Sequence, residues 1–184
     1  MNFLKSISIP STVSLKIDKN LCTFSGPNGV NVYKLHNFLR VKVENDFLCL
    51  YADDSLVKKR DFIFLSSIFN TTYVMLKNCM LGVTKFFEYF LVLRGVGYKV
   101  SYDKKNSILV MLLGYSHPIN LSVPSDILIE LPSNSEIIVK SIFKDKAGQF
   151  AADIRALKIS DIYKGNGIRY KNENIILKVP KKAK

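Results

Sequence analysis

The order of local sequence patterns repeats in the two halves of the chain, and this repeat restricts the fold more than any other feature. In each half, several short strand-like segments separated by turn residues come first, and one helix-like segment follows. Such an order indicates duplication of a small α+β unit. We therefore predict an α+β fold of two similar small domains, each a mostly antiparallel sheet with one helix packed on one face.

In the first half, the clearest turn is the Gly, Pro and Asn cluster Ser25-Gly26-Pro27-Asn28-Gly29. A long helix is expected after Asp53-Asp54-Ser55, whose side chains suit an N-cap, and it is expected to run to about Leu81. We place the domain boundary near Gly82, which divides the chain into domains 1–81 and 82–184. The strands predicted here are 7–9, 13–17, 21–24, 30–33, 38–43 and 47–51.

The second half contains a better-defined helix. Ala147, Phe150, Ala151, Ile154 and Leu157 recur at helical spacing and form one apolar stripe. The pair of glycines at 95 and 97 could be half of a dinucleotide-binding fingerprint, but the third glycine and the following helix are missing, so a bend is expected there. The strands predicted here are 86–93, 98–102, 108–113, 119–123, 127–131 and 137–142.

The charge of the chain is unevenly distributed. It carries 27 Lys and Arg against 15 Asp and Glu, a formal charge of +12. Residues 140–184 hold 12 basic and 4 acidic residues, which is +8 of that total. A clustered basic surface is typical of nucleic-acid binders. The basic tail has no amphipathic helix or lipidation signal, and no apolar stretch is long enough to span a membrane, so a membrane partner is not expected.

Within this basic region, the segment 160–171 has the chemistry of an RNA contact. Lys164, Arg169 and Lys171 offer charge to phosphates, and Tyr163 and Tyr170 offer flat faces to bases or sugars. The glycines at 165 and 167 permit close backbone approach to a partner. We therefore expect alanine at either glycine to weaken RNA binding while leaving thermal stability nearly unchanged. The alternative is a solvated basic loop.

The sequence offers little for catalysis or metal binding. His36 and His117 are the two histidines, and Cys22, Cys49 and Cys79 lie too far apart for a paired metal or redox motif. Reduced, buried thiols are expected. We expect no catalytic residue, no metal, no cofactor and no small-molecule substrate, and therefore no enzyme. An RNA-processing enzyme or ribosome-maturation factor with the same basic surface is the alternative function.

Several motifs together resemble one family, the universal large-subunit ribosomal protein L-six. The segment 160–168 is similar to its acidic residue followed by Y-K-G-K-G, with Asn166 in place of the second lysine. Tyr73 stands where the family usually has an arginine, and Lys158-Ile159-Ser160-Asp161-Ile162 replaces Arg-Arg-Pro-Glu-Pro. The other matching blocks, in family order, are Gly26-Pro27-Asn28-Gly29, Leu81-Gly82-Val83-Thr84, Leu93-Arg94-Gly95-Val96-Gly97-Tyr98, Leu113-Gly114-Tyr115-Ser116-His117-Pro118 and Gly148-Gln149-Phe150-Ala151-Ala152-Asp153-Ile154-Arg155.

The resemblance implies a structural protein that binds large-subunit rRNA near the sarcin–ricin loop and the base of the factor-binding stalk, mainly through its second domain. Large-subunit rRNA and neighbouring large-subunit proteins are the implied partners. For Arg155 and Lys158, a solvated helix face is the alternative to an RNA contact. The expected rRNA-binding residues are Arg94, Gly95, Gly97, Ser116, His117, Arg155, Lys158, Tyr163, Lys164, Gly165, Gly167, Arg169, Tyr170 and Lys171.

The expected location is an organelle. Ile, Phe, Asn and Lys are frequent, and their codons are AT-rich, as in compact organellar genomes. The first strand-like residues follow Met1 directly, which leaves no room for a presequence. We therefore expect a protein of the mitochondrial matrix, made there as part of the mitochondrial ribosome. A plastid or the bacterial cytoplasm is the alternative.

Overall fold

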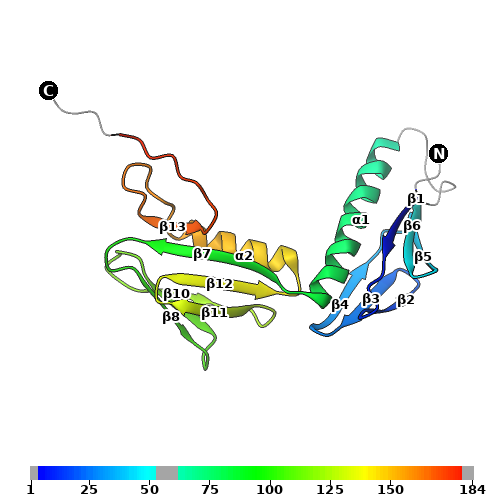
Figure 1. Cartoon of the computed structure of the whole chain (residues 1–184), viewed down its shortest axis with the longest axis horizontal. Helices are drawn as coiled ribbons and strands as arrows, with labels where there is room; N and C mark the ends of the chain where they lie inside the picture. Colours follow the sequence, from blue (N-terminus) through cyan, green and yellow to red (C-terminus); the bar gives the residue numbers. More distant parts are fainter. Residues whose placement is uncertain (1–3, 53–61, 180–184) are drawn as a thin grey trace. The chain divides into compact units, whose positions relative to one another are not determined.

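The computed structural model describes residues 4–52 and 62–179 of the chain, which separates into two compact units, 1–86 and 87–184. Among these described residues, each unit contains one α-helix and two small β-sheets. Figure 1 shows the helix of each unit beside its sheets. Every pair of neighbouring strands in these sheets is antiparallel. The predicted α+β fold with two similar small domains is confirmed.

The first unit contains two three-stranded sheets with the orders β1-β6-β5 and β2-β3-β4. Polar and apolar residues alternate along several of these strands, so that one face of each sheet turns inward. Phe24, Leu39, Leu48 and Leu50 are fully buried and form the sheet side of the core. The strands are β1 Leu4–Ser8, β2 Ser14–Asp18, β3 Leu21–Gly26, β4 Gly29–Lys34, β5 Leu39–Glu44 and β6 Phe47–Ala52.

Helix α1, Phe62–Thr84, packs against β3 and β4 and extends beyond the predicted end at Leu81. Its last turn contacts the turn between β3 and β4, where the backbone N–H of Asn28 donates to the carbonyl of Val83 at 3.1 Å. A Cβ at Gly26 would lie 2.7 Å from that carbonyl oxygen, so only glycine fits. The predicted N-cap, Asp53-Asp54-Ser55, lies outside the described residues.

The second unit is built on a four-stranded sheet with the order β11-β12-β7-β13, together with a three-stranded sheet β10-β9-β8. Its longest strand, β7 Phe87–Arg94, lies between β12 and β13 and bends at its end into the turn that leads to β8. The other strands are β8 Lys99–Asp103, β9 Ile108–Leu112, β10 Ile119–Ser122, β11 Leu128–Ser133, β12 Glu136–Ser141 and β13 Gly167–Tyr170.

Helix α2, Lys144–Ala156, covers one face of the four-stranded sheet, where it contacts β7, β12 and β13 (Figure 1). The predicted apolar stripe is the buried face of this helix: Ala147, Phe150, Ala151 and Ile154 are buried, and Leu157 packs at its edge. Two of these positions are alanines, so the helix can approach the sheet closely.

Strand β13 was not predicted from the sequence, which indicated a loop over these residues. Its four residues pair antiparallel with β7, from Gly167 opposite Arg94 to Tyr170 opposite Leu91. Ile168 is fully buried in the core of the second unit. A strand this short is stabilised by its neighbour across the sheet, and the local sequence carries no alternating pattern that would reveal it.

In the part of the chain that the structure describes, no helix has the length and apolarity needed to cross a membrane.

Candidate nucleic-acid interface

Three loops of the second unit meet at the end of β7, and we call them together the loop platform. They are the turn 94–98 after β7, the turn 114–118 between β9 and β10, and the segment 158–171 after α2. Arg94 pairs with Gly167 across the sheet. The Tyr115 hydroxyl donates to the carbonyl of Leu157, the residue before the third loop, at 3.1 Å, and the Lys158 ammonium lies 4.5 Å from the centre of the Tyr115 ring. These contacts join the second loop to the start of the third. Most of the residues expected to bind rRNA therefore lie on one surface.

The Tyr98 ring joins the first two loops. A Cβ at Gly95 would lie 2.8 Å from this ring, and one at Gly114 would lie 3.3 Å from it. Gly97 completes the turn with φ +75°, a conformation that favours glycine, and the Tyr98 N–H donates to the Gly95 carbonyl at 3.3 Å. The expected bend is thus confirmed, and its glycines make room for an aromatic ring.

Asp161 shapes the tip of the third loop. Its carboxylate accepts hydrogen bonds from the backbone N–H of Lys164 at 3.0 Å and of Tyr163 at 3.2 Å. These bonds, that of Lys164 first, lower the pKa of the Asp161 carboxyl. Because the loop's backbone is tied to this carboxylate, the exposed side chains of Tyr163 and Lys164 project from a defined turn.

The two glycines of the third loop have different surroundings. Gly165 adopts φ +71°, and the nearest atom to an added Cβ would be the terminal methyl of Leu177 at 3.3 Å. Gly167 adopts φ +149°, and a Cβ there would lie 2.5 Å from the Ser160 Cα. This geometry opposes the expectation that alanine at Gly167 leaves stability nearly unchanged, because the backbone of Ser160 occupies the space of a Cβ. Whether either glycine also approaches RNA stays a prediction.

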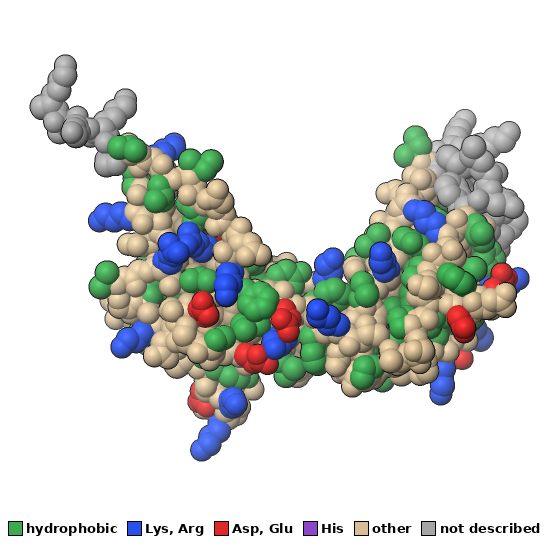
Figure 2. All heavy atoms as spheres, viewed as in Figure 1, with side chains coloured by type: hydrophobic (Ala, Val, Ile, Leu, Met, Phe, Trp, Pro, Cys, Tyr) green, Lys and Arg blue, Asp and Glu red, His purple; other side chains and the backbone are tan. Residues whose placement is uncertain are grey.

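Several cations of the platform form no close ion pair among the described residues. Arg94, Lys164 and Lys171 are exposed and form no ion pair within the described residues. On the face drawn in Figure 2, blue Lys and Arg side chains surround the region that Figure 1 labels β13. Unpaired cations on a surface with exposed tyrosines suit contact with phosphates and bases.

Arg155 forms an ion pair with a carboxylate of the same unit. Its guanidinium donates to both carboxylate oxygens of Glu173, at 2.5 Å and 3.1 Å, and lies 5.9 Å from the centre of the Tyr170 ring. The hydrogen bond to Arg155 lowers the pKa of Glu173. Glu173 also accepts the backbone N–H of Tyr170 at 3.1 Å. The bidentate pair therefore ties the end of α2 to the segment after β13.

Lys158 lies on the loop platform and not on a solvated face of α2. Its ammonium stands 4.5 Å from the centre of the Tyr115 ring. Ser116 and His117 are exposed in the same loop as Tyr115. Their expected contact with rRNA remains a prediction.

The sequence interpretation missed two residues that organise the platform, Tyr115 and Glu173. Both act through partners distant in sequence, 42 and 18 residues away. An aromatic residue inside a Gly-Tyr-Ser-His-Pro turn was the available signal for Tyr115. No local pattern distinguishes Glu173 from a solvated carboxylate.

In the first unit, a cation lies beside Tyr73, the residue that replaces the arginine usual in the resembled family. The ammonium of Lys5 in β1 lies 4.8 Å from the centre of the Tyr73 ring and donates to the side chain of Asn70 at 2.7 Å. A cation from β1 thus stands beside α1, next to the position where the resembled family has its arginine.

The titratable groups of the described residues do not gather into a metal site: none of them form a group of three or more His, Cys, Asp or Glu suited to a metal ion. The chemistry of the second unit is instead that of cations and aromatic rings on a surface fixed by backbone contacts. An α+β unit with such a surface is typical of the class of basic nucleic-acid-binding proteins.

Comparison with known proteins narrows that class to one family. A sequence model described as Ribosomal protein L6 matches residues 94–171, which include the whole loop platform. The chain is 37% identical over 180 residues to the large ribosomal subunit protein uL6 of Caldicellulosiruptor bescii, covering 98% of this chain and 94% of that protein. It is 40% identical over 179 residues to uL6 of Mycoplasmoides gallisepticum, covering 96% and 93%. The chain belongs to the ribosomal protein L6 family.

Membership in this family has two consequences for the expectations. The family is a structural, non-enzymatic component of the ribosome, so the expectation that this chain is not an enzyme is confirmed. The relatives named here are bacterial, which does not support the expected mitochondrial location and is consistent with the alternative, the bacterial cytoplasm.

Proposed function

We propose that this protein, a structural constituent of the large ribosomal subunit, binds large-subunit rRNA through the loop platform. One observation carries the proposal: three loops that are distant in sequence meet on one surface, where Arg94, Lys164 and Lys171 have no ion-pair partner among the described residues. Folding alone would not require these cations to lie together, because like charges repel.

The finer placement follows from the resemblance to the family. The rRNA partner is the region of the sarcin–ricin loop and the base of the factor-binding stalk, and neighbouring large-subunit proteins complete the contacts. The protein acts by holding rRNA in position and turns over no substrate. The sequence led us to expect a mitochondrial ribosome, whereas the bacterial relatives favour a bacterial one. Sequencing the genome that encodes the chain decides between the two.

Salt dependence of RNA binding tests the proposal. If the platform neutralises about four to six phosphates, log K should fall with log salt at a slope of roughly −3 to −5. Lys164→Ala and Arg169→Ala should each flatten this slope by about one. Lys104→Ala, in the exposed hairpin loop between β8 and β9, is the matched control and should leave the slope unchanged. The measurement is filter binding of the full chain to a large-subunit rRNA fragment.

Two results would contradict the proposal. An unchanged slope in both platform variants would mean that the loop is a solvated basic surface. A protein that leaves the large subunit in a high-salt wash would instead behave as the alternative, an RNA-processing or maturation factor.

A further inference from the structure

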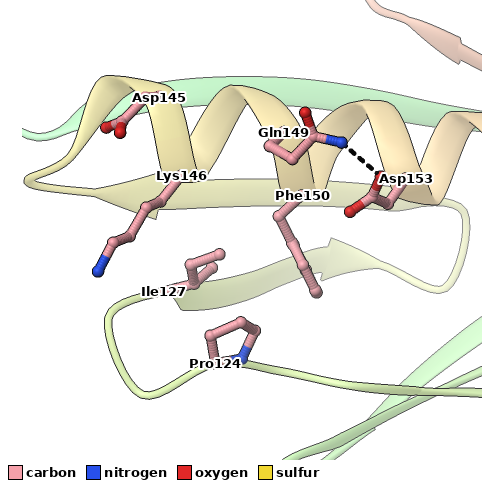
Figure 3. Close-up of a pocket in the computed structure, with 7 residues that line it drawn as sticks. All are labelled: Pro124, Ile127, Asp145, Lys146, Gln149, Phe150 and Asp153. Carbon is pink, nitrogen blue, oxygen red and sulfur yellow. Dashed lines mark hydrogen bonds between the residues drawn. The ribbon is translucent and has the colours of Figure 1, made fainter.

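The second unit also has a hollow beside α2 whose chemistry is opposite to that of the loop platform. Its volume is about 430 Å³, and none of its lining residues belongs to the platform. Figure 3 shows these residues: Pro124, Ile127, Asp145, Lys146, Gln149, Phe150 and Asp153. We call this hollow the acidic pocket.

The floor of the acidic pocket is apolar and well supported. Phe150 points from α2 toward Ile127 and Pro124 in Figure 3. Phe150 and Ile127 are only 6% and 5% exposed, so their positions are set by the core. The Ile127 N–H donates to the Pro124 carbonyl at 3.0 Å, which closes the turn that carries both residues. The floor is therefore fixed by the core, and these two side chains expose only a small apolar area.

The rim carries more negative than positive charge. Lys146 forms an ion pair with Asp126, so its ammonium is already matched. Asp145 and Asp153 form no ion pair within the described residues. The Gln149 amide donates to one oxygen of Asp153 at 2.8 Å, which orients this carboxylate beside the floor. In a chain of net charge +12, this excess of carboxylates is unusual.

The helix dipole favours one of the two unmatched carboxylates and disfavours the other. Asp145 lies in the first turn of α2, where a negative charge is favourable because of the helix dipole. Asp153 lies near the C-terminal end of the same helix, where a negative charge is unfavourable. The hydrogen bond from the Gln149 amide, four residues earlier, offsets part of this cost and holds the carboxylate beside the apolar floor. No cation among the described residues pairs with it there.

We propose that the acidic pocket receives a lysine or arginine side chain from an extended basic segment of a neighbouring protein. The methylene stem would lie on the floor, chiefly along the exposed Pro124, and the cationic head would meet Asp153. Asp145 lies eight residues earlier on α2, about 12 Å away along the helix, and adds to the negative potential without touching the same head. RNA does not suit this surface, because its phosphates would face the carboxylates. The neighbour's place in the large subunit rests on the proposed function; the chemistry of the pocket does not.

A peptide titration of the folded full-length protein tests the chemistry. The probe is acetyl-Gly-Ala-Arg-Ala-Gly-amide, and the same peptide with glutamine in place of arginine is its control. In NMR spectra, the arginine peptide should shift the backbone signals of Gln149, Phe150 and Asp153, and the glutamine peptide should not. The double variant Asp145→Asn/Asp153→Asn should bind the arginine peptide about tenfold more weakly.

A matched control separates a specific pocket from general charge attraction. Glu44→Gln/Asp46→Asn removes the same charge at the turn between β5 and β6 and should leave peptide binding unchanged. Melting curves check that both double variants are folded. The proposal would be overturned if both double variants bound the arginine peptide equally weakly, or if Asp145→Asn/Asp153→Asn bound it as tightly as the wild type. Peptide-induced shifts confined to other surfaces would also overturn it.

A cross-linking experiment in the particle tests the partner class. A benzoylphenylalanine placed at the exposed Ser125, beside the pocket, should cross-link to a basic segment of another large-subunit protein. Cross-links to rRNA alone would overturn the proposal. Failure of the chain to enter the subunit would contradict the proposed function and the partner's location, whereas the peptide titration would still decide the chemistry of the pocket.

Discussion

At the scale of single residues, the platform shows how one residue type can serve two purposes in neighbouring positions. Gly165 and Gly167 look equivalent in the sequence. In the structure, an added Cβ at the first would meet a flexible side chain, and one at the second would meet the backbone of Ser160. Close packing within the protein therefore accounts for Gly167, whereas backbone conformation accounts for Gly165.

We predict that the two alanine variants differ in stability. Gly167→Ala should lower the unfolding free energy by about 2–4 kcal/mol, because it combines strain with a clash against backbone. Gly165→Ala should cost about 1 kcal/mol, from the left-handed conformation alone. Thermal unfolding of the full chain measures both. Equal losses, or a Gly167→Ala protein as stable as the wild type, would contradict this account.

The pair between Arg155 and Glu173 predicts a pH dependence. Because the pKa of Glu173 is lowered from its ordinary value of 4.5, its contribution to stability is fully present above that pH. The contribution is lost as the pH falls through the lower pKa of the folded protein. Glu173→Gln should therefore destabilise the second unit by about 1 kcal/mol at pH 7, and by progressively less below pH 4.5.

Urea unfolding of the second unit at a series of pH values checks this prediction. Glu136→Gln is the control, since this β12 carboxylate forms no ion pair among the described residues. A difference between wild type and Glu173→Gln that stays constant from pH 7 to pH 3 would show that the ion pair does not stabilise the fold.

At the scale of elements, β13 connects the core of the second unit to its loop platform. Ile168 of this strand is fully buried in the core, and Arg169 and Tyr170 follow it on the same strand. A parallel bridge joins Ile168 to Ile159, and the Ile168 N–H donates to the Lys158 carbonyl at 2.8 Å. The edge of the sheet thus determines where the basic side chains stand.

Truncation of Ile168 should therefore affect both stability and binding. Ile168→Ala should lower the unfolding free energy by about 2–4 kcal/mol through the cavity that it leaves. It should also weaken rRNA binding, because the neighbouring cations lose their fixed position. Ile176→Ala is the control: this side chain is 86% exposed, so the change should stay within about 0.5 kcal/mol. Denaturation and filter binding measure the two effects.

The result for Ile168 also distinguishes two accounts of the platform. If Ile168→Ala destabilises the unit but leaves rRNA affinity intact at a temperature where it is folded, the platform cations act as a mobile cluster and β13 does not position them.

At the scale of the whole molecule, the second unit has its own core. The buried cluster that extends from Leu91 to Ile168 draws all its members from this unit. Gly82 itself lies in the last turn of α1, and its neighbour Val83 contacts Gly26 of the first unit. Residues 82–86 are therefore expected to add nothing to the folding of the second unit.

We predict that fragments 82–184 and 87–184 fold equally well and bind large-subunit rRNA with the salt dependence of the full chain. Circular dichroism melting and filter binding are the measurements. An unfolded 82–184 fragment, or a folded one without affinity for rRNA, would show that binding needs both units. A stable 82–184 fragment beside an unstable 87–184 fragment would assign residues 82–86 to the second unit.

Much of the architecture followed from local patterns. The turn residues, the alternating strands and the apolar stripe of α2 are properties of neighbouring residues, so the sequence alone determined the two-part α+β plan. The family motifs and the concentration of charge in residues 140–184 determined the class of partner in the same way.

Tertiary structure alone decided the details that depend on residues distant in sequence. Strand β13 exists because β7 lies beside it, and Gly167 is required because Ser160 occupies the space of a side chain. Arg155 turns to Glu173 rather than to solvent, and Asp153 stands beside an apolar floor built partly from the β10–β11 connection. Pairing, steric exclusion and charge matching act between atoms in space, whereas spacing along a chain specifies only its local geometry.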